Sequence, residues 1–463
     1  MRKVATIILA AGQGKRMKSI TAKVLHPLAG KPMLYYPLTI AREIGSQKII
    51  VVVGYHQEKV KKTFPDADIT YVTQNEQLGT GHAVACARKA LTDFNGDVLL
   101  LYGDIPLLKK ATLETLINIH REGKNAVTVL TTKKDDPTGY GRIIRDDTGN
   151  VQKIIEEKDA TPQQKAIQEV NSGIYCFDAH FLITASDALS CQNAQQEYYL
   201  TDTIAVARKR GERVASFFVP DEVEVMGVNN RIELAQASEE IRKYILEKLM
   251  LEGVSIINPK DTYVDLDVRV GKDTVIYPNT FLMGNTEIGD QCVIESGCQI
   301  IDSKIGSRVT IRWASVIDGS VIRDQATIGP FAHIRPHSDI GEEARIGNFV
   351  EVKKSAIGKG SKASHLSYLG DTTVGKGVNV GAGTITCNYD GVSKHPTIIE
   401  DDVFIGSNTE LIAPVRIGRG ALIGAGSTIT KDVPPETLAI GRAKQVNLKK
   451  KPFLPKKIRK ESE

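Results

Sequence analysis

The sequence predicts an α/β protein that combines two architectures, and three observations lead to this fold class. The first half alternates short apolar runs with amphipathic stretches, as in a mostly parallel sheet covered by helices. One long helical stretch follows at residues 230–252. Between there and residue 445, aliphatic residues recur at six-residue spacing in two runs, which is typical of a parallel β-helix. We therefore expect domains at 1–229 and 253–445, a linker helix at 230–252 and a tail at 446–463.

The predicted strands of the first half are rich in leucine and β-branched residues. They read VATIILAAG, KIIVVVG, DVLLLYGD and AVTVLTT, and amphipathic segments such as LYYPLTIAREIG separate them. Continuous apolar runs indicate strands that are buried on both faces of a sheet. The linker stretch NRIELAQASEEIRKYILEKLMLE carries an apolar stripe with helical spacing, from Ile232 to Leu249.

The second half repeats a six-residue pattern. Six-residue spacing relates two sets of aliphatic anchors: Ile328, Ile334, Ile340, Ile346 and Val352, and Ile399, Ile405, Leu411, Ile417, Ile423 and Ile429. This spacing predicts a β-helix with three short strands in each coil of about 18 residues. Each buried anchor stabilises the stack by roughly 1.5–3 kcal/mol, so many coils together offset the entropy of ordering the chain.

Composition and charge exclude several classes of protein. No apolar run reaches the length of a membrane span, and the six cysteines form no C-x-x-C pair, which argues against a zinc site or a disulfide scaffold. A reducing cytoplasm is the expected compartment. The formal net charge of +5 belongs entirely to the C-terminal segment NLKKKPFLPKKIRKESE. Such a tail could touch nucleic acid or anionic lipid, but a solvated end is favoured and no nucleic-acid partner is expected.

The first half places chemistry-bearing residues after its predicted strands. LAAGQGKRM leaves a strand through a glycine-rich turn, whose backbone N–H groups could cradle phosphates or simply form a tight turn. Asp104 ends the strand run VLLLYGD, and Asn229 follows VEVMGV. Ligands of open α/β sheets bind beyond the carboxyl ends of strands, where these oxygens suit Mg²⁺. The alternative for Asp104 is a simple turn cap.

The order of motifs in this half resembles that of sugar-1-phosphate nucleotidyltransferases. The motifs are LAAGQGKRM, KVLHPLAGKPM, QNEQLGTGHA, YGDIP, GYGRI, IEEKDA, VNSGIY and GVNN. The resemblance implies a Rossmann-like nucleotidyltransferase domain in which Asp104 and Asn229 hold Mg²⁺. It also implies a set of residues that bind UTP and the UDP-sugar product: Leu9, Ala11, Gly12, Arg16, Lys23, Gln74, Gly79, Thr80, Tyr102, Gly141, Glu156, Asn171 and Asn229.

The six-residue pattern also predicts which side chains of the β-helix point outward. Arg335 follows the anchor Ile334 and Lys353 follows Val352, so both point out, one coil apart. Two cations about 5 Å apart repel each other by under 1 kcal/mol in water and by about 3 kcal/mol at an effective dielectric near 20. An anion between them would reverse that sign, so a phosphate site is one reading and two splayed, solvated side chains the other. His365 also points out, with Ala382 in the same slot one coil further; such a histidine is either a plain surface residue or a general base.

With the β-helix included, nearly the whole chain resembles the bacterial bifunctional family that uridylylates N-acetylglucosamine-1-phosphate and acetylates glucosamine-1-phosphate. The resemblance implies a left-handed helix, a homotrimer, acetyl-CoA as co-substrate and His365 as the general base. The acceptor sugar phosphate would be held by Arg335, Lys353, Tyr368, Asn379, Asn388, Tyr389 and Lys394. Acetyl-CoA would be met by Ala382, Ser407, Ala425 and Arg442.

The stretch TITCNYDGVSKH, at positions 384–395, interrupts the six-residue pattern. The separation of Val380 and Ile399 is one coil plus one position, so we expect one coil loosened into a loop that carries Asn388, Tyr389 and Lys394 to the sugar. Three alternatives to the bifunctional enzyme stay open at this point. The β-helix could serve only regulation or oligomerisation, the whole chain could be a scaffold without activity, or the first site could take another nucleotide or sugar.

Overall fold

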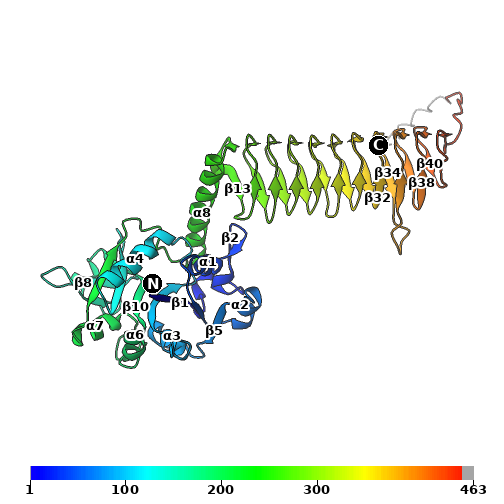
Figure 1. The fold of residues 1–463 in the computed structure, drawn as a ribbon. Helices are drawn as coiled ribbons and strands as arrows, with labels where there is room; N and C mark the ends of the chain where they lie inside the picture. Colours follow the sequence, from blue (N-terminus) through cyan, green and yellow to red (C-terminus); the bar gives the residue numbers. More distant parts are fainter. Residues whose placement is uncertain (1, 451–463) are drawn as a thin grey trace, which may run out of the picture. The chain divides into compact units, whose positions relative to one another are not determined.

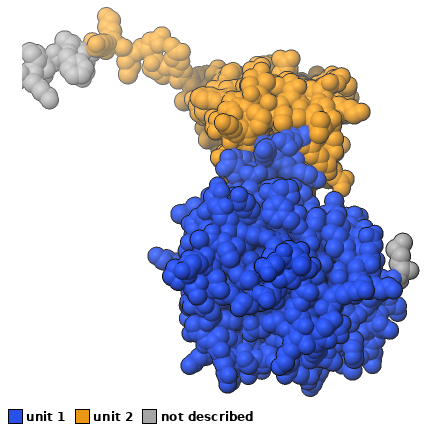
Figure 2. All heavy atoms as spheres, turned by 90° about the vertical axis from the view of Figure 1, so that its left-hand side faces the viewer, with its two compact units in different colours: residues 1–247 blue, residues 248–463 orange. Residues whose placement is uncertain are grey.

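The computed structural model describes residues 2–450, so most of the predicted basic tail, residues 451–463, lies outside the described residues. The chain divides into two compact units at residue 247, shown in two colours in Figure 2. The division falls inside helix α8 (Arg231–Leu251), which occupies the predicted linker stretch. Ala237, Ile241, Ile245 and Leu249 of the predicted stripe are buried, whereas Ile232 is exposed.

The first unit contains a sheet that is mostly parallel, as predicted. Its main path runs β11 (Val214–Phe218), β7 (Val127–Lys133), β10 (Glu169–Asp178), β6 (Gly96–Tyr102), β1 (Lys3–Ala10), β4 (Lys48–Val53) and β5 (Ile69–Thr73). Only β10 on this path runs antiparallel to its neighbours, β6 and β7. A further hairpin, β8 (Arg142–Arg145) with β9 (Val151–Ile155), joins the sheet through β10, and β2 (Pro27–Leu28) pairs with β3 (Lys31–Pro32).

Helices cover both faces of this sheet because its strands alternate side chains between two cores. In β1, Ile7 belongs to one buried cluster and Ile8 to the other. The first cluster includes residues of α3 (Thr80–Ala87), α6 (Ala179–Ser186) and α7 (Asp202–Lys209). The second includes residues of α1 (Tyr35–Glu43), α2 (Gln57–Thr63) and α4 (Lys110–Glu122). The short α5 (Pro162–Lys165) buries no residue. This arrangement leaves the carboxyl edge of the parallel strands for a ligand.

The second unit is a β-helix of three parallel sheets, whose coils stand in a row in Figure 1. The 11-stranded sheet contains β12 (Ser255–Ile256), β15 (Val275–Ile276), β18 (Val293–Ile294), β21 (Thr310–Ile311), β24 (Thr327–Ile328), β27 (Arg345–Asn348), β30 (Lys362–His365), β33 (Asn379–Val380), β36 (Phe404–Ile405), β39 (Leu422–Ile423) and β41 (Leu438–Ala439). The 10-stranded sheet contains β13 (Thr262–Val264), β16 (Thr280–Met283), β19 (Gln299–Ile301), β22 (Val316–Asp318), β25 (His333–Ile334), β28 (Glu351–Lys353), β31 (Tyr368–Gly370), β34 (Ile385–Cys387), β37 (Glu410–Ile412) and β40 (Thr428–Ile429). The nine-stranded sheet contains β14 (Arg269–Val270), β17 (Glu287–Ile288), β20 (Lys304–Ile305), β23 (Val321–Ile322), β26 (Asp339–Ile340), β29 (Ala356–Ile357), β32 (Thr372–Val374), β35 (Thr397–Ile399) and β38 (Val415–Ile417).

The predicted anchors form the interior of this β-helix. Ile328 pairs with Ile346 on the next coil, and Ile334 pairs with Val352. These four side chains are fully buried. The six-residue pattern therefore predicted the inward side chains correctly, and with them the outward direction of the residues that follow.

The expected length of the interrupted coil was wrong. Val380 pairs with Ile405, so this coil is longer than an ordinary coil by a whole inserted segment, and Ile399 pairs with Val374 in a different sheet. The expected length was counted from Val380 to Ile399, which are anchors of two different sheets. The extra segment lies between β34 and β35 and forms a hairpin with an antiparallel bridge from Tyr389 to Lys394. Figure 1 shows this segment in orange, leaving the row of coils beside β32.

Candidate functional sites

A pocket of about 310 Å³ lies at the carboxyl edge of the sheet in the first unit. Nine of the predicted ligand-binding residues line it: Leu9, Ala11, Gly12, Lys23, Gln74, Gly79, Thr80, Tyr102 and Asp104. Lys23 lies in the 3₁₀ turn Lys23–Leu25. The others lie at the ends of β1, β5 and β6 and at the start of α3, as expected where parallel strands present their carboxyl ends to one edge.

The glycine-rich turn after β1 is held open by tight contacts. Gly14 has a φ of 63°, and a Cβ added there would lie 2.7 Å from Lys23 Cβ, so only glycine fits without displacement. Gln77 Nε2 donates to the Ala11 carbonyl oxygen over 2.7 Å, which fixes the start of the turn. No motif in the sequence pointed to this role of Gln77. Arg16 lies exposed in the 3₁₀ turn Lys15–Met17.

Asp104 and Asn229, the predicted metal ligands, converge on one point. Lys23 Nζ donates to Asn229 Oδ1 over 2.7 Å and forms an ion pair with the Asp104 carboxylate. One carboxylate and one amide oxygen thus meet the same positive charge. This donor set fits Mg²⁺, which is usually bound through one or two protein oxygens together with substrate phosphates and water.

Three residues of the predicted UDP-sugar set lie together: Gly141 just before β8, Glu156 just after β9, and Asn171 on β10. Asn171 donates its backbone N–H to the Gly141 carbonyl oxygen over 2.8 Å, and a Cβ at Gly141 would lie 3.5 Å from a Glu156 oxygen. Burial raises the pKa of Glu156, whose carboxylate accepts a hydrogen bond from Thr201 Oγ1 over 3.0 Å. Burial raises the pKa of Tyr102, and the nearby Glu156 and Asp104 carboxylates raise it further. Because Tyr102 lines the pocket, Glu156 lies next to the pocket as well.

In the second unit, His365 is oriented by a neighbour on the preceding coil. Asn348 pairs with His365 in register, and Asn348 Oδ1 lies 2.7 Å from His365 Nδ1. An amide oxygen can only accept, so Nδ1 carries the proton and Nε2 keeps its lone pair. Sequence reasoning missed Asn348, because its slot in the coil carries no aliphatic anchor and no charge.

His365 belongs to a column of residues that follows the register of the coils. The backbone hydrogen bonds Gly383 to Leu366, Asn408 to Ala382 and Gly426 to Ser407 continue it from coil to coil. Ala382, Ser407 and Ala425 therefore succeed His365, one on each coil. Arg442 Nη1 donates to the Ala425 carbonyl oxygen at the far end of this column.

Two cations of the 10-stranded sheet and one of the hairpin lie near one another. Arg335 and Lys353 follow the paired anchors Ile334 and Val352, so they lie on adjacent coils as predicted. Lys353 also lies against Lys394 of the hairpin, which lowers the pKa of the Lys394 ammonium. Glu351 forms an ion pair of 2.7 Å with Arg335, a partner that the sequence did not indicate. An anion would relieve the mutual repulsion of Lys353 and Lys394.

The hairpin is closed by its own hydrogen bonds. Asp390 accepts hydrogen bonds from the backbone N–H groups of Ser393 and Val392, and its Oδ2 lies 2.7 Å from His395 Nε2. These contacts lower the pKa of Asp390. Asn388 Nδ2 donates to Asp371 at the base of the hairpin. Tyr368 and Asn379, the remaining predicted sugar-binding residues, lie on β31 and β33.

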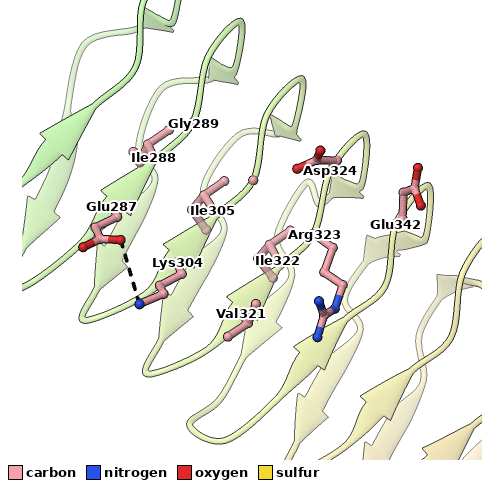
Figure 3. Close-up of a pocket in the computed structure, with 11 residues that line it drawn as sticks. Glu287, Ile288, Gly289, Lys304, Ile305, Val321, Ile322, Arg323, Asp324 and Glu342 are labelled. Carbon is pink, nitrogen blue, oxygen red and sulfur yellow. Dashed lines mark ion pairs between the residues drawn. The ribbon is translucent and has the colours of Figure 1, made fainter.

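A larger hollow of about 630 Å³ lies on the nine-stranded sheet (Figure 3) and contains none of the predicted site residues. Its charged side chains pair with their neighbours. Lys304 lies 3.9 Å from Glu287, and Arg323 lies 2.6 Å from Asp339. The hollow is therefore a shallow ion-paired surface of the sheet.

Family models match both units. The nucleotidyl transferase model covers residues 5–227. The bacterial transferase hexapeptide model, of six repeats, covers 267–302 and 319–354, and the hexapeptide repeat model of succinyl-transferase covers 396–431. Relatives extend over almost the whole chain. The bifunctional protein GlmU of Geotalea daltonii is 54% identical over 96% of this chain and 98% of that protein.

The chain belongs to the GlmU family. Two further members show how widely the likeness holds. The bifunctional protein GlmU of Geotalea uraniireducens is 52% identical over 96% of this chain and 98% of its own length, and that of Shouchella clausii is 51% identical over 95% and 97%. The chain is thus a bifunctional transferase with a nucleotidyltransferase domain and a left-handed β-helix of hexapeptide repeats. No helix within residues 2–450 is both long and apolar enough to cross a membrane.

Proposed function

We propose that this member of the GlmU family makes UDP-N-acetylglucosamine from glucosamine-1-phosphate in two steps, one at each site. The β-helix site acetylates the sugar amine with acetyl-CoA. The pocket then transfers a uridylyl group from UTP to N-acetylglucosamine-1-phosphate and releases diphosphate. The observation that carries the proposal is the His365 imidazole, which Asn348 orients. The same β-helix carries the cations Arg335, Lys353 and Lys394.

His365 acts as the general base of acetyl transfer. Asn348 accepts the Nδ1–H hydrogen bond, so Nε2 keeps the lone pair that takes the proton. The amine nitrogen attacks the thioester carbon, its proton passes to Nε2, the C–S bond breaks, and the coenzyme leaves as a thiolate that then takes up the proton. Arg335, Lys353 and Lys394 attract the phosphate of the acceptor.

The remaining predicted residues surround these reacting groups. Asn388, Tyr389, Tyr368 and Asn379 hold the acceptor sugar. Acetyl-CoA follows the column of Ala382, Ser407 and Ala425, with Arg442 at its end. Three of these column residues have small side chains, which leaves room for a ligand beside the coils.

Uridylyl transfer needs positioning and charge neutralisation but no covalent enzyme intermediate. A phosphate oxygen of the sugar attacks the α-phosphorus of UTP in line with the bond to diphosphate, which breaks. The glycine-rich turn, Arg16 and Lys23 balance the phosphate charges. Gln74, Gly79 and Thr80 contact the uracil. Glu156, with Gly141 and Asn171, binds the amino sugar.

Asp104 and Asn229 hold Mg²⁺ in this proposal. Their oxygens already converge on the Lys23 ammonium, so they reach a common point that a cation can occupy. When bound, Mg²⁺ neutralises charge that develops on the phosphates during transfer. Lys23 is then available to the phosphates.

A homotrimer accounts for an apolar column that borders the acetyl-transfer site. Trp313, Phe331, Phe349 and Leu366 are 53%, 41%, 56% and 61% exposed, and the Phe331 and Phe349 rings stack with centroids 5.3 Å apart. A neighbouring copy would bury this column next to His365. Sedimentation tests the state: a wild-type monomer at micromolar concentration would refute it, and Phe349→Glu should weaken the assembly. With its six free thiols, the chain is expected in the cytoplasm.

One experiment tests the two activities together. The full chain is incubated with glucosamine-1-phosphate, acetyl-CoA, UTP and Mg²⁺, and UDP-N-acetylglucosamine is measured. Asp104→Asn should abolish diphosphate release but retain CoA release. His365→Ala should abolish CoA release, and it should still release diphosphate when N-acetylglucosamine-1-phosphate is supplied directly. If His365→Ala still acetylated glucosamine-1-phosphate at the normal rate, the β-helix would serve regulation or assembly instead. A panel with dTTP and GTP tests the choice of nucleotide.

A further inference from the structure

Gln74 has an amide orientation that the backbone dictates. Its side chain lies at the end of β5 in the pocket wall and is only 5% exposed. Gln74 Nε2 lies 3.1 Å from the Gly79 carbonyl oxygen. A carbonyl oxygen accepts but never donates, so the group that faces it must be the amino end of the amide.

His82, on α3, takes the second hydrogen of that amino group. Gln74 Nε2 lies 3.1 Å from His82 Nδ1, which must therefore carry a lone pair. The ring proton is then on Nε2, which lies 3.8 Å from Cys86 Sγ, a soft acceptor. With both amino hydrogens committed, Oε1 is the atom of the Gln74 amide that is left to meet a ligand.

We propose that His82 is the specificity-determining positioning residue of the nucleotide pocket. Its unprotonated Nδ1, together with the Gly79 carbonyl, holds the Gln74 oxygen toward the nucleobase, so that the pocket accepts a base with an imide N–H and rejects cytosine. The inference rests on the proposed function, because it assumes that Gln74 meets the base. Uracil donates its ring N–H to Oε1. Cytosine offers a lone pair at the same position, so two acceptors would face each other without a proton.

Removal of the His82 acceptor loosens this arrangement. The amino group of Gln74 would keep only Gly79 as a partner, and one of its hydrogens would be left unpaired in a buried place. The flipped amide would still set Oε1 against the Gly79 carbonyl oxygen. The free-energy preference for the observed orientation of the Gln74 amide therefore falls by about the net free energy of one hydrogen bond. The ratio of the two amide orientations then changes by up to roughly tenfold.

Two variants of the full-length chain separate shape from hydrogen bonding. His82→Leu fills similar space without an acceptor, whereas His82→Asn offers an amide oxygen near the Nδ1 position. The assay is kcat/KM for diphosphate release with UTP and with CTP. We expect His82→Leu to lower the UTP-over-CTP ratio by about five- to tenfold, mainly through KM for UTP. His82→Asn should restore the ratio to within about threefold of wild type. Acetyl transfer in the same samples controls for integrity.

The outcomes distinguish this inference from the function beneath it. If the wild-type chain turned over no UTP, the proposed function itself would fail. If wild type used UTP and His82→Leu kept the wild-type ratio, the role of His82 would be refuted. Equal losses in His82→Leu and His82→Asn would also refute it, since only shape would then matter. Should His82→Leu lower the melting temperature, His82→Ala repeats the comparison with a smaller side chain.

Discussion

Asn348 should control the rate of acetyl transfer only through His365. Its Oδ1 is 2.7 Å from Nδ1 and holds the tautomer whose Nε2 can accept a proton. A net hydrogen bond is worth about 1 kcal/mol, so Asn348→Ala should lower kcat for acetyl transfer by about fivefold. His365→Ala, which removes the proposed base, should lower kcat about 10²–10⁴-fold. Thiol release from acetyl-CoA measures both, and uridylyl transfer in the same preparation is the control.

A double-mutant cycle decides whether this reasoning is right. If Asn348 acts by orienting the imidazole, Asn348→Ala has nothing left to disturb once His365 is alanine. The double variant should then match His365→Ala within error. A further fivefold loss in the His365→Ala background would refute the positioning role. So would a change confined to KM for acetyl-CoA, because an orienting hydrogen bond should affect the chemical step.

Three other perturbations test the two sites. Lys353→Ala removes one of the two adjacent cations and should raise KM for glucosamine-1-phosphate about tenfold, with diphosphate release unchanged. Asp390→Asn should open the hairpin that carries Lys394 and raise the same KM, whereas Glu400→Gln, on another coil corner, should not. Burial raises the pKa of Glu156, so its neutral form favours the folded state below the ordinary carboxyl pKa of 4.5, and that advantage is lost as pH rises through the folded value. Glu156→Gln should therefore raise the melting temperature at pH 8 and leave it unchanged at pH 4. If the substitution changed the melting temperature equally at both pH values, the raised pKa of Glu156 would be contradicted.

Sequence patterns predicted the β-helix in more detail than the first unit. Period and anchor position together decide which side chain points outward, so the adjacency of Arg335 and Lys353 followed directly from the sequence. The same counting failed at Val380, because an inserted hairpin changes the register without leaving a mark in the anchors on either side. Asn348 was missed because the pattern describes the inward positions and is silent about which outward polar residue orients a neighbour.

In the first unit, contacts between distant segments were beyond local patterns. Lys23 meets Asn229 from the opposite end of the domain's sequence, and only the order of strands in the sheet brings them together. Each motif suggested a ligand by itself. The Asp104 and Asn229 oxygens both contact the Lys23 ammonium because of the sheet topology. The spacing of residues within a motif does not encode that topology.

The column that begins at His365 places one residue on each coil at a regular spacing along the axis of the β-helix. Neighbouring strands of a sheet lie about 4.8 Å apart, so Ala382, Ser407 and Ala425 stand roughly 5, 10 and 14 Å along the axis from the base. In the proposed mechanism the thioester must therefore lie within about one coil spacing of His365, and the rest of the coenzyme extends along the next two coils. Adding or removing a whole coil between these residues would change their distance from His365 by one coil spacing. The aliphatic anchors would still pair with one another. The repeat thus sets distance as well as stability.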